Sequence, residues 1–194
     1  MNVRRDPVWF NLVGYQLVWF ASVIGAGRGL WWVGVSAAAA FALVHLAVCR
    51  QTAVERAADF RLLGVAIACG LLLDGALALS GLADYAADDR ALPADGAPLW
   101  ILSMWAAFAL TLRHSMRFLL GRPAWAFALG AIGGPLAYLG AARGWQAIAF
   151  AEPRWMALAA LAAGWGLAIP LLTTLATRWS QAPVSSPAIA GSAR

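Results

Sequence analysis

The stretch FRLLGVAIACGLLLDGALALSGL, residues 60–82, contains only two charged side chains, Arg61 and Asp74. An α-helix needs about 20 apolar residues to cross roughly 30 Å of hydrocarbon. The helix is the required form because lipid offers no hydrogen-bond partners to open backbone groups. The stretch therefore predicts a membrane-spanning helix.

Five further apolar stretches of similar length lie on either side of it. The six predicted spans cover residues 7–24, 30–48, 60–82, 98–120, 123–141 and 155–177. We therefore expect an all-α fold, a bundle of six transmembrane helices that forms a single transmembrane domain over residues 1–177. Residues 178–194 are rich in Pro, Ser and Gly, and this composition predicts a disordered cytoplasmic tail.

The composition excludes several classes of protein. Hydrophobic residues make up 62% of the chain and charged residues 12%, whereas soluble domains average about 45–50% and about 25%. A soluble globular enzyme and a disulfide-stapled secreted domain are therefore excluded. The net charge of +5 is spread thinly between apolar runs, so we expect no nucleic-acid partner.

The arginines predict the orientation of the chain. If the N-terminus is cytoplasmic, ten of the fourteen arginines lie on the inner side, and cytoplasmic loops carry an excess of positive charge. We therefore expect both termini in the cytoplasm, with the Asp-rich segment 84–95 on the outer side.

Asp74 is a candidate intramembrane acid because an ionisable group within the bilayer is costly. It lies thirteen residues after Arg61, roughly 20 Å into the membrane. Its functional interpretation is a proton-binding carboxylate or a substrate contact. The structural alternative is a hydrogen bond to another helix, for example to Gln16 or Tyr138.

A second group of polar residues is expected near the cytoplasmic ends of three spans. Asn11 lies in the first span, His45 in the second, and Thr111 and His114 in the fourth. A continuous helix places Thr111 and His114 on one face. We expect the four residues to form a polar layer under the inner leaflet; the structural alternative is hydrogen bonding between helices.

Arg113 and Arg117 are four residues apart and lie on a different face of the fourth span. Long basic side chains near a span end reach lipid phosphates. We therefore expect lipid-phosphate anchoring, with recognition of an anionic headgroup between helices as the alternative.

No metal site, cofactor or disulfide is predicted. Cys49 and Cys69 are expected at different depths, and two histidines without a third ligand do not make a metal site. The carboxylates Glu55 and Asp59 lie near the inner loop at a spacing that is not specific.

Glycines in the fifth span predict close helix packing. Gly130 and Gly134 form a GxxxG pair, which lets another helix approach closely. Pro135 should kink the same helix.

Three stretches carry a family resemblance: PLWILSMWAAFALTLRHS at residues 98–115, the pattern Asn11, Gln16 and Trp19, and GGPLAY at residues 133–138. They resemble an uncharacterised bacterial inner-membrane family of unknown function. Genes of that family often lie near cyclopropane-fatty-acid-synthase-like methyltransferases, so the resemblance implies a lipid-related role in the bacterial inner membrane. It implies no catalytic residues.

Three functions follow as hypotheses, and the sequence leaves open whether the protein is an enzyme. The first is a lipid-binding or lipid-modification accessory near the inner leaflet, with membrane lipids and a lipid-modifying enzyme or other membrane proteins as partners. The second is a small proton-coupled transporter that uses Asp74. The third is a non-catalytic scaffold of a membrane complex.

Overall fold

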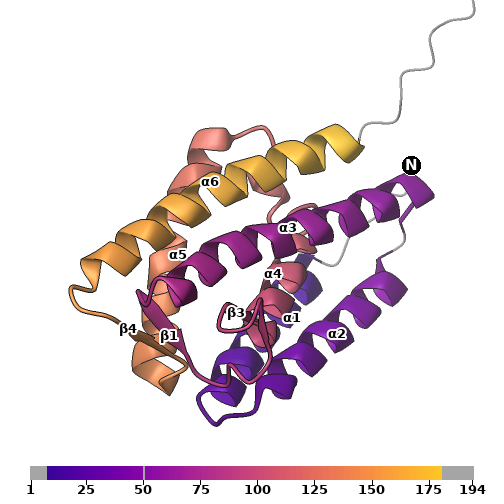
Figure 1. Ribbon diagram of the computed structural model, residues 1–194. Helices are drawn as coiled ribbons and strands as arrows, with labels where there is room; N and C mark the ends of the chain where they lie inside the picture. The colour runs from indigo at the N-terminus through magenta and orange to yellow at the C-terminus, as the bar shows by residue number, and fades with distance from the viewer. Residues whose placement is uncertain (1–7, 50, 181–194) are drawn as a thin grey trace, which may run out of the picture.

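The computed structural model describes residues 8–49 and 51–180, and within them six α-helices form one bundle (Figure 1). The helices are α1 (Val8–Ala26), α2 (Trp31–Val48), α3 (Ala53–Leu79), α4 (Leu99–Ala109), α5 (Pro123–Trp145) and α6 (Trp155–Ser180). All but α4 are long and apolar enough to cross a membrane. The predicted bundle of six helices is thus confirmed, with five membrane-length helices in place of the six expected, whereas the cytoplasmic placement of the termini stays a prediction. Residues 181–194 of the predicted tail lie outside the described residues.

The fourth predicted span, 98–120, is not one continuous helix. α4 has 11 residues, about 16 Å or half the hydrocarbon thickness. The chain then turns through residues 110–116 and adds a 3₁₀ turn at Arg117–Leu119. The α-helix stops there because side chains bond the carbonyl groups of its last turn: the Thr111 hydroxyl donates to the Phe108 carbonyl over 2.6 Å, and Asn11 on α1 donates to the Leu110 carbonyl over 3.1 Å.

α4 is the central element of the bundle. It packs against α1, α2 and α3, and Trp100 and Trp105 are at most 1% exposed. A helix that is apolar on every side is a buried one. The hairpin α1–α2 and helix α3 therefore cover α4, and α6 contacts it through Trp165 (Figure 1).

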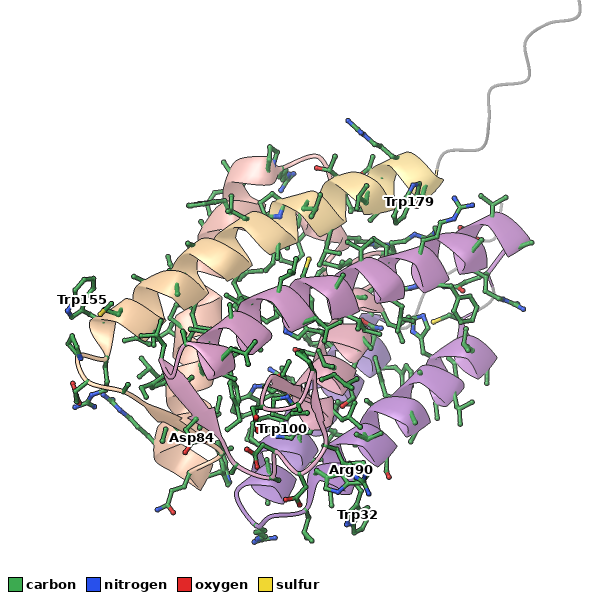
Figure 2. All side chains as sticks on the ribbon, in the orientation of Figure 1. Trp32, Asp84, Arg90, Trp100, Trp155 and Trp179 are labelled. Carbon is green, nitrogen blue, oxygen red and sulfur yellow. The ribbon has the colours of Figure 1, made fainter. Side chains whose placement is uncertain are left out.

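Short strands tie the loops together at one end of the bundle. β1 (Ala83–Tyr85) pairs antiparallel with β4 (Ile148–Phe150), and β2 (Ala91–Leu92) pairs with β3 (Ala97–Pro98). The loop between α3 and α4 is thereby joined to the loop between α5 and α6. Trp155 and Trp179 lie at opposite ends of α6 (Figure 2), as expected for interfacial anchors.

α3 begins at Ala53, seven residues before the predicted span. A capping box forms where Thr52 accepts a hydrogen bond from the Glu55 amide and the Glu55 carboxylate accepts one from the Thr52 amide. This pair satisfies backbone donors at the helix start. The cap therefore extends the helix through the polar residues that include Asp59.

The GxxxG pair packs α5 closely on α6. A Cβ atom built on Gly130 would lie 2.2 Å from the Trp165 carbonyl oxygen, and one on Gly134 would lie 2.7 Å from the Trp165 ring. Both glycines are buried. The contact therefore leaves no room for even one methyl group.

We expect Gly130→Ala to lower the free energy of unfolding by roughly 1–3 kcal/mol, because the added methyl group overpacks the α5–α6 contact. Gly133→Ala is the matched control, since its nearest neighbour would be a Leu129 methyl carbon at 3.9 Å. Thermal unfolding of both variants in detergent measures the effect. Equal stability of the two variants would contradict the packing assignment.

Candidate functional site

Two clusters of buried polar side chains lie inside the bundle. The Asp74 cluster comprises Asp74, Tyr85, Trp105 and Tyr138. The histidine cluster comprises Asn11, His45, Cys49, Gln51, Asp59, Arg113, His114 and Ser115. Along α3, Asp59 and Asp74 are roughly 22 Å apart, so the clusters lie towards opposite ends of the bundle.

Asp74 is fully buried and accepts three hydrogen bonds. The hydroxyl groups of Tyr85 and Tyr138 donate to its Oδ1 over 2.8 and 2.5 Å, and the Trp105 indole donates to its Oδ2 over 2.7 Å. A carboxylate without such donors would be strongly unfavourable in an apolar interior. Of the two partners considered from the sequence, Tyr138 is observed, whereas Gln16 is exposed on α1.

Neighbouring groups keep the hydrogen-bond donors to Asp74 protonated and in place. Tyr85 lies in β1, outside the spans, and burial together with the Asp74 carboxylate raises its pKa far above the ordinary value, so the phenol stays a donor. The Trp105 ring stacks on Trp165 with ring centroids 3.8 Å apart. Gly70 makes room for it, because a Cβ atom there would lie 2.4 Å from the Trp105 ring.

In the histidine cluster, Asn11 bridges the non-helical segment 110–116. Its Nδ2 donates to the Leu110 carbonyl over 3.1 Å and lies 3.3 Å from His45 Nδ1. Its Oδ1 accepts bonds from the Ser115 hydroxyl and amide over 2.6 and 3.3 Å. One side chain thus satisfies backbone groups that the end of α4 leaves open.

Asp59 joins the histidines to Arg113. Its Oδ1 accepts a hydrogen bond from Arg113 Nη1 over 2.8 Å, and its Oδ2 lies 3.7 Å from Nε2 of both His45 and His114. The two imidazole rings meet edge to face, with centroids 4.5 Å apart. A buried carboxylate therefore has a guanidinium group on one side and two imidazole groups on the other.

The structure brings together three of the four residues expected in the polar layer, Asn11, His45 and His114. Thr111 is buried nearby, but its hydroxyl bonds within its own turn. Arg113 is bound to Asp59 and to the Glu55 carbonyl, whereas Arg117 is exposed at the end of the bundle. The lipid-anchoring role stays a prediction.

Sequence reasoning missed Asp59, Cys49 and Gln51 as members of the histidine cluster. Cys49 follows His45 by four residues, a spacing that places the two side chains together at a helix end, and its Sγ lies 3.7 Å from His45 Nδ1. That spacing was the available signal. Gln51 reaches His114 and Asp59 from the loop after α2, which no short-range pattern indicates.

A cavity of about 410 Å³ lies between α1, α4, α5 and α6. Its walls are mostly aromatic and aliphatic, and they include Tyr138, Trp105 and Trp165 from the region of the Asp74 cluster. Tyr15 and Met116 line it as well. The volume lies within the range of roughly 300–1,000 Å³ that is typical of small-molecule sites.

Five membrane-length helices around a buried half-helix, with polar clusters enclosed between them, define a multi-pass helical membrane protein. The chain belongs to the family described as "Protein of unknown function (DUF2878)", which matches residues 8–171. No curated protein and no solved structure matches this chain.

Tyr138→Phe should lower the free energy of unfolding by roughly 1–3 kcal/mol, because Asp74 loses a donor while it remains buried. Tyr15→Phe is the control, since the Tyr15 hydroxyl makes no hydrogen bond within the part of the chain that the structure describes. Chemical or thermal unfolding in detergent compares them. If Tyr138→Phe is as stable as Tyr15→Phe, the hydrogen bond to Asp74 does not stabilise the fold.

Proposed function

We propose that the protein binds lipid in the bacterial inner membrane, with both termini cytoplasmic. One acyl chain of a membrane phospholipid enters the cavity sideways from the bilayer. The observation that carries this proposal is the cavity itself, which is mostly apolar and has the volume of a small-molecule site.

The position of the cavity supports lateral entry from lipid. Gln16 and Phe20 on α1 and Leu129 on α5 line the cavity and are also exposed at the surface of the bundle. α1 packs on α2 and α4 and makes little contact with α5. The mouth therefore lies between α1 and α5, on a surface that faces lipid when these helices span the membrane.

Trp165 supplies a polar contact for the bound lipid. Its indole N–H is buried in the cavity wall and has no hydrogen-bond partner among the described residues. A buried donor left unpaired costs about 1–3 kcal/mol. A rotation of the indole would bring this N–H to the cavity surface, where an ester carbonyl or another acceptor on the lipid would satisfy it.

Arg117 is placed to hold the phosphate of the same lipid. It follows Met116, which lines the cavity, and its side chain is exposed at the end of the bundle. A guanidinium group there reaches the headgroup level. The bound lipid would then be available to a lipid-modifying enzyme, the partner that the family resemblance implies.

Among the alternatives, the transporter hypothesis has less support because Asp74 is enclosed by three hydrogen-bond donors. The scaffold hypothesis does not account for the cavity. No reaction is assigned to the chain.

Filling the cavity should weaken lipid binding. Ala137 lines the cavity, whereas its neighbour Leu136 is 61% exposed on the outer face of α5. We expect Ala137→Phe to reduce lipid capture about tenfold or more, which corresponds to about 1.4 kcal/mol, and Leu136→Phe to leave it unchanged. Photo-crosslinking with a phospholipid that carries a diazirine in one acyl chain measures the capture, and mass spectrometry locates the adducts.

In the wild-type protein, adducts on buried wall residues such as Met104 and Ile169 would agree with the proposal. Equal labelling of the wild type, Ala137→Phe and Leu136→Phe, with adducts only on outward-facing residues, would contradict it. Both variants must elute as folded protein of the wild-type size.

A further inference from the structure

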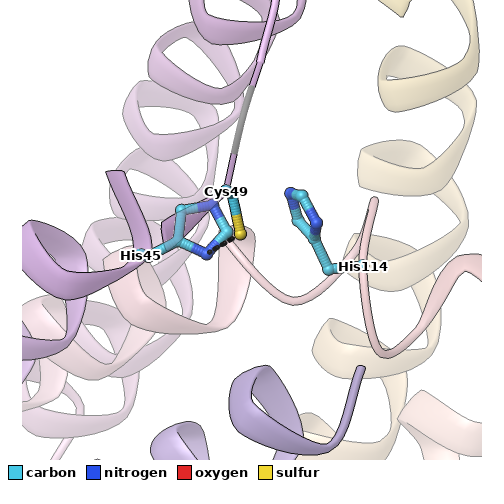
Figure 3. Close-up of side chains that lie close together, drawn as sticks. All are labelled: His45, Cys49 and His114. Atoms are coloured by element: carbon cyan, nitrogen blue, oxygen red, sulfur yellow. Dashed lines mark hydrogen bonds between the residues drawn. The ribbon is translucent and has the colours of Figure 1, made fainter. Parts of the chain in front are cut away.

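Three side chains that can donate to a metal ion converge in the histidine cluster. His45 comes from α2, Cys49 from the loop that follows it, and His114 from the segment after α4 (Figure 3). Their ligand atoms all lie within 4.8 Å of one another, and all three residues are buried. This convergence is independent of the cavity on which the proposed lipid binding depends.

We infer that this site binds Zn²⁺. Two imidazole nitrogens and a thiolate sulfur are ligands that zinc prefers. Donor atoms bound at 2.0–2.3 Å to one zinc ion stand about 3.3–3.7 Å apart, and Cys49 Sγ already lies 3.7 Å from His45 Nδ1. A small inward movement of His114 completes the three-ligand set.

Asp59 supplies the outer partner that zinc-binding histidines usually have. When Nδ1 of His45 binds the ion, its Nε2 carries the proton and faces Asp59 Oδ2 at 3.7 Å. Among the described residues, this nitrogen is buried without a hydrogen-bond partner. A carboxylate in that position orients the ring and strengthens its bond to the metal.

Negative groups lie close to the site of the ion. Zinc binding releases the proton of the Cys49 thiol. The Zn²⁺ ion and the Arg113 guanidinium then face the Cys49 thiolate and the carboxylates of Asp59 and Glu55, the latter 3.7 Å from Arg113 Nη2. Two of these anions, the Cys49 thiolate and the Asp59 carboxylate, are buried with the ion, and the partly exposed Glu55 adds a third negative charge at the edge of the cluster.

Gln51 and Asn11 adjust to the ion. The Gln51 amide nitrogen lies 3.3 Å from His114 Nε2 and also donates to Asp59. The Gln51 carbonyl oxygen is buried with no partner in the described chain. Asn11 gives up its contact with His45 Nδ1 and keeps those with Leu110 and Ser115.

Zinc content and cobalt spectroscopy test this inference on the purified full chain in detergent. After treatment with a chelator, reloading with Zn²⁺ and desalting, we expect about one Zn²⁺ ion per chain. Loading with Co²⁺ should give the thiolate-to-cobalt charge-transfer band. Cys49→Ser should remove that band and weaken zinc binding by at least about tenfold. Cys69→Ser is the matched control on α3 and should keep both.

A second readout does not depend on variants. Zn²⁺ should protect Cys49 of the wild-type protein from alkylation by N-ethylmaleimide and leave the half-buried Cys69 unaffected. Wild-type protein that retains no zinc and shows no thiolate-to-cobalt band would overturn the inference. So would identical zinc content in Cys49→Ser and Cys69→Ser.

Discussion

The hydrogen bonds of Asn11 to segment 110–116 are the interaction on which the rest of the interior depends. Irregular backbone inside a membrane protein persists only where its polar groups find partners within the protein. Asn11 supplies them by donating to the Leu110 carbonyl and accepting from Ser115. These bonds allow α4 to end at Ala109. The segment that follows then places the His114 ring in contact with the His45 ring.

The early end of α4 also separates the two proposed sites. On one side of the segment, His114 and Arg113 close the histidine cluster with Asp59. On the other side, Met116 lines the cavity that opens between α1 and α5. A zinc ion held by His45, Cys49 and His114 would join α2 to this segment and so stabilise one wall of the lipid cavity.

The sequence predicted the apolar helices well, because hydropathy and length determine whether a segment can cross a membrane. It also singled out Asp74, Asn11, His45 and His114, since polar groups in apolar runs are costly. The break in the fourth span was missed although a polar run begins at Thr111, because the partners that hold the break lie on α1 and α3 and no local pattern reveals them. Asp59 and Gln51 were missed for a related reason: their role depends on how the loop after α2 meets α3, which no local spacing encodes.

Hydrogen–deuterium exchange of segment 110–116 tests the central claim most directly. Asn11→Leu should leave the Ser115 amide and the Leu110 carbonyl without their partner, while Gln16→Leu changes an exposed residue of the same helix. Exchange of the amides in 110–116 should rise about tenfold or more in Asn11→Leu, equivalent to about 1.4 kcal/mol of lost local stability. Exchange in α5 and α6 should stay unchanged, as should the whole pattern of Gln16→Leu. Wild-type protection of segment 110–116 in Asn11→Leu would contradict the account.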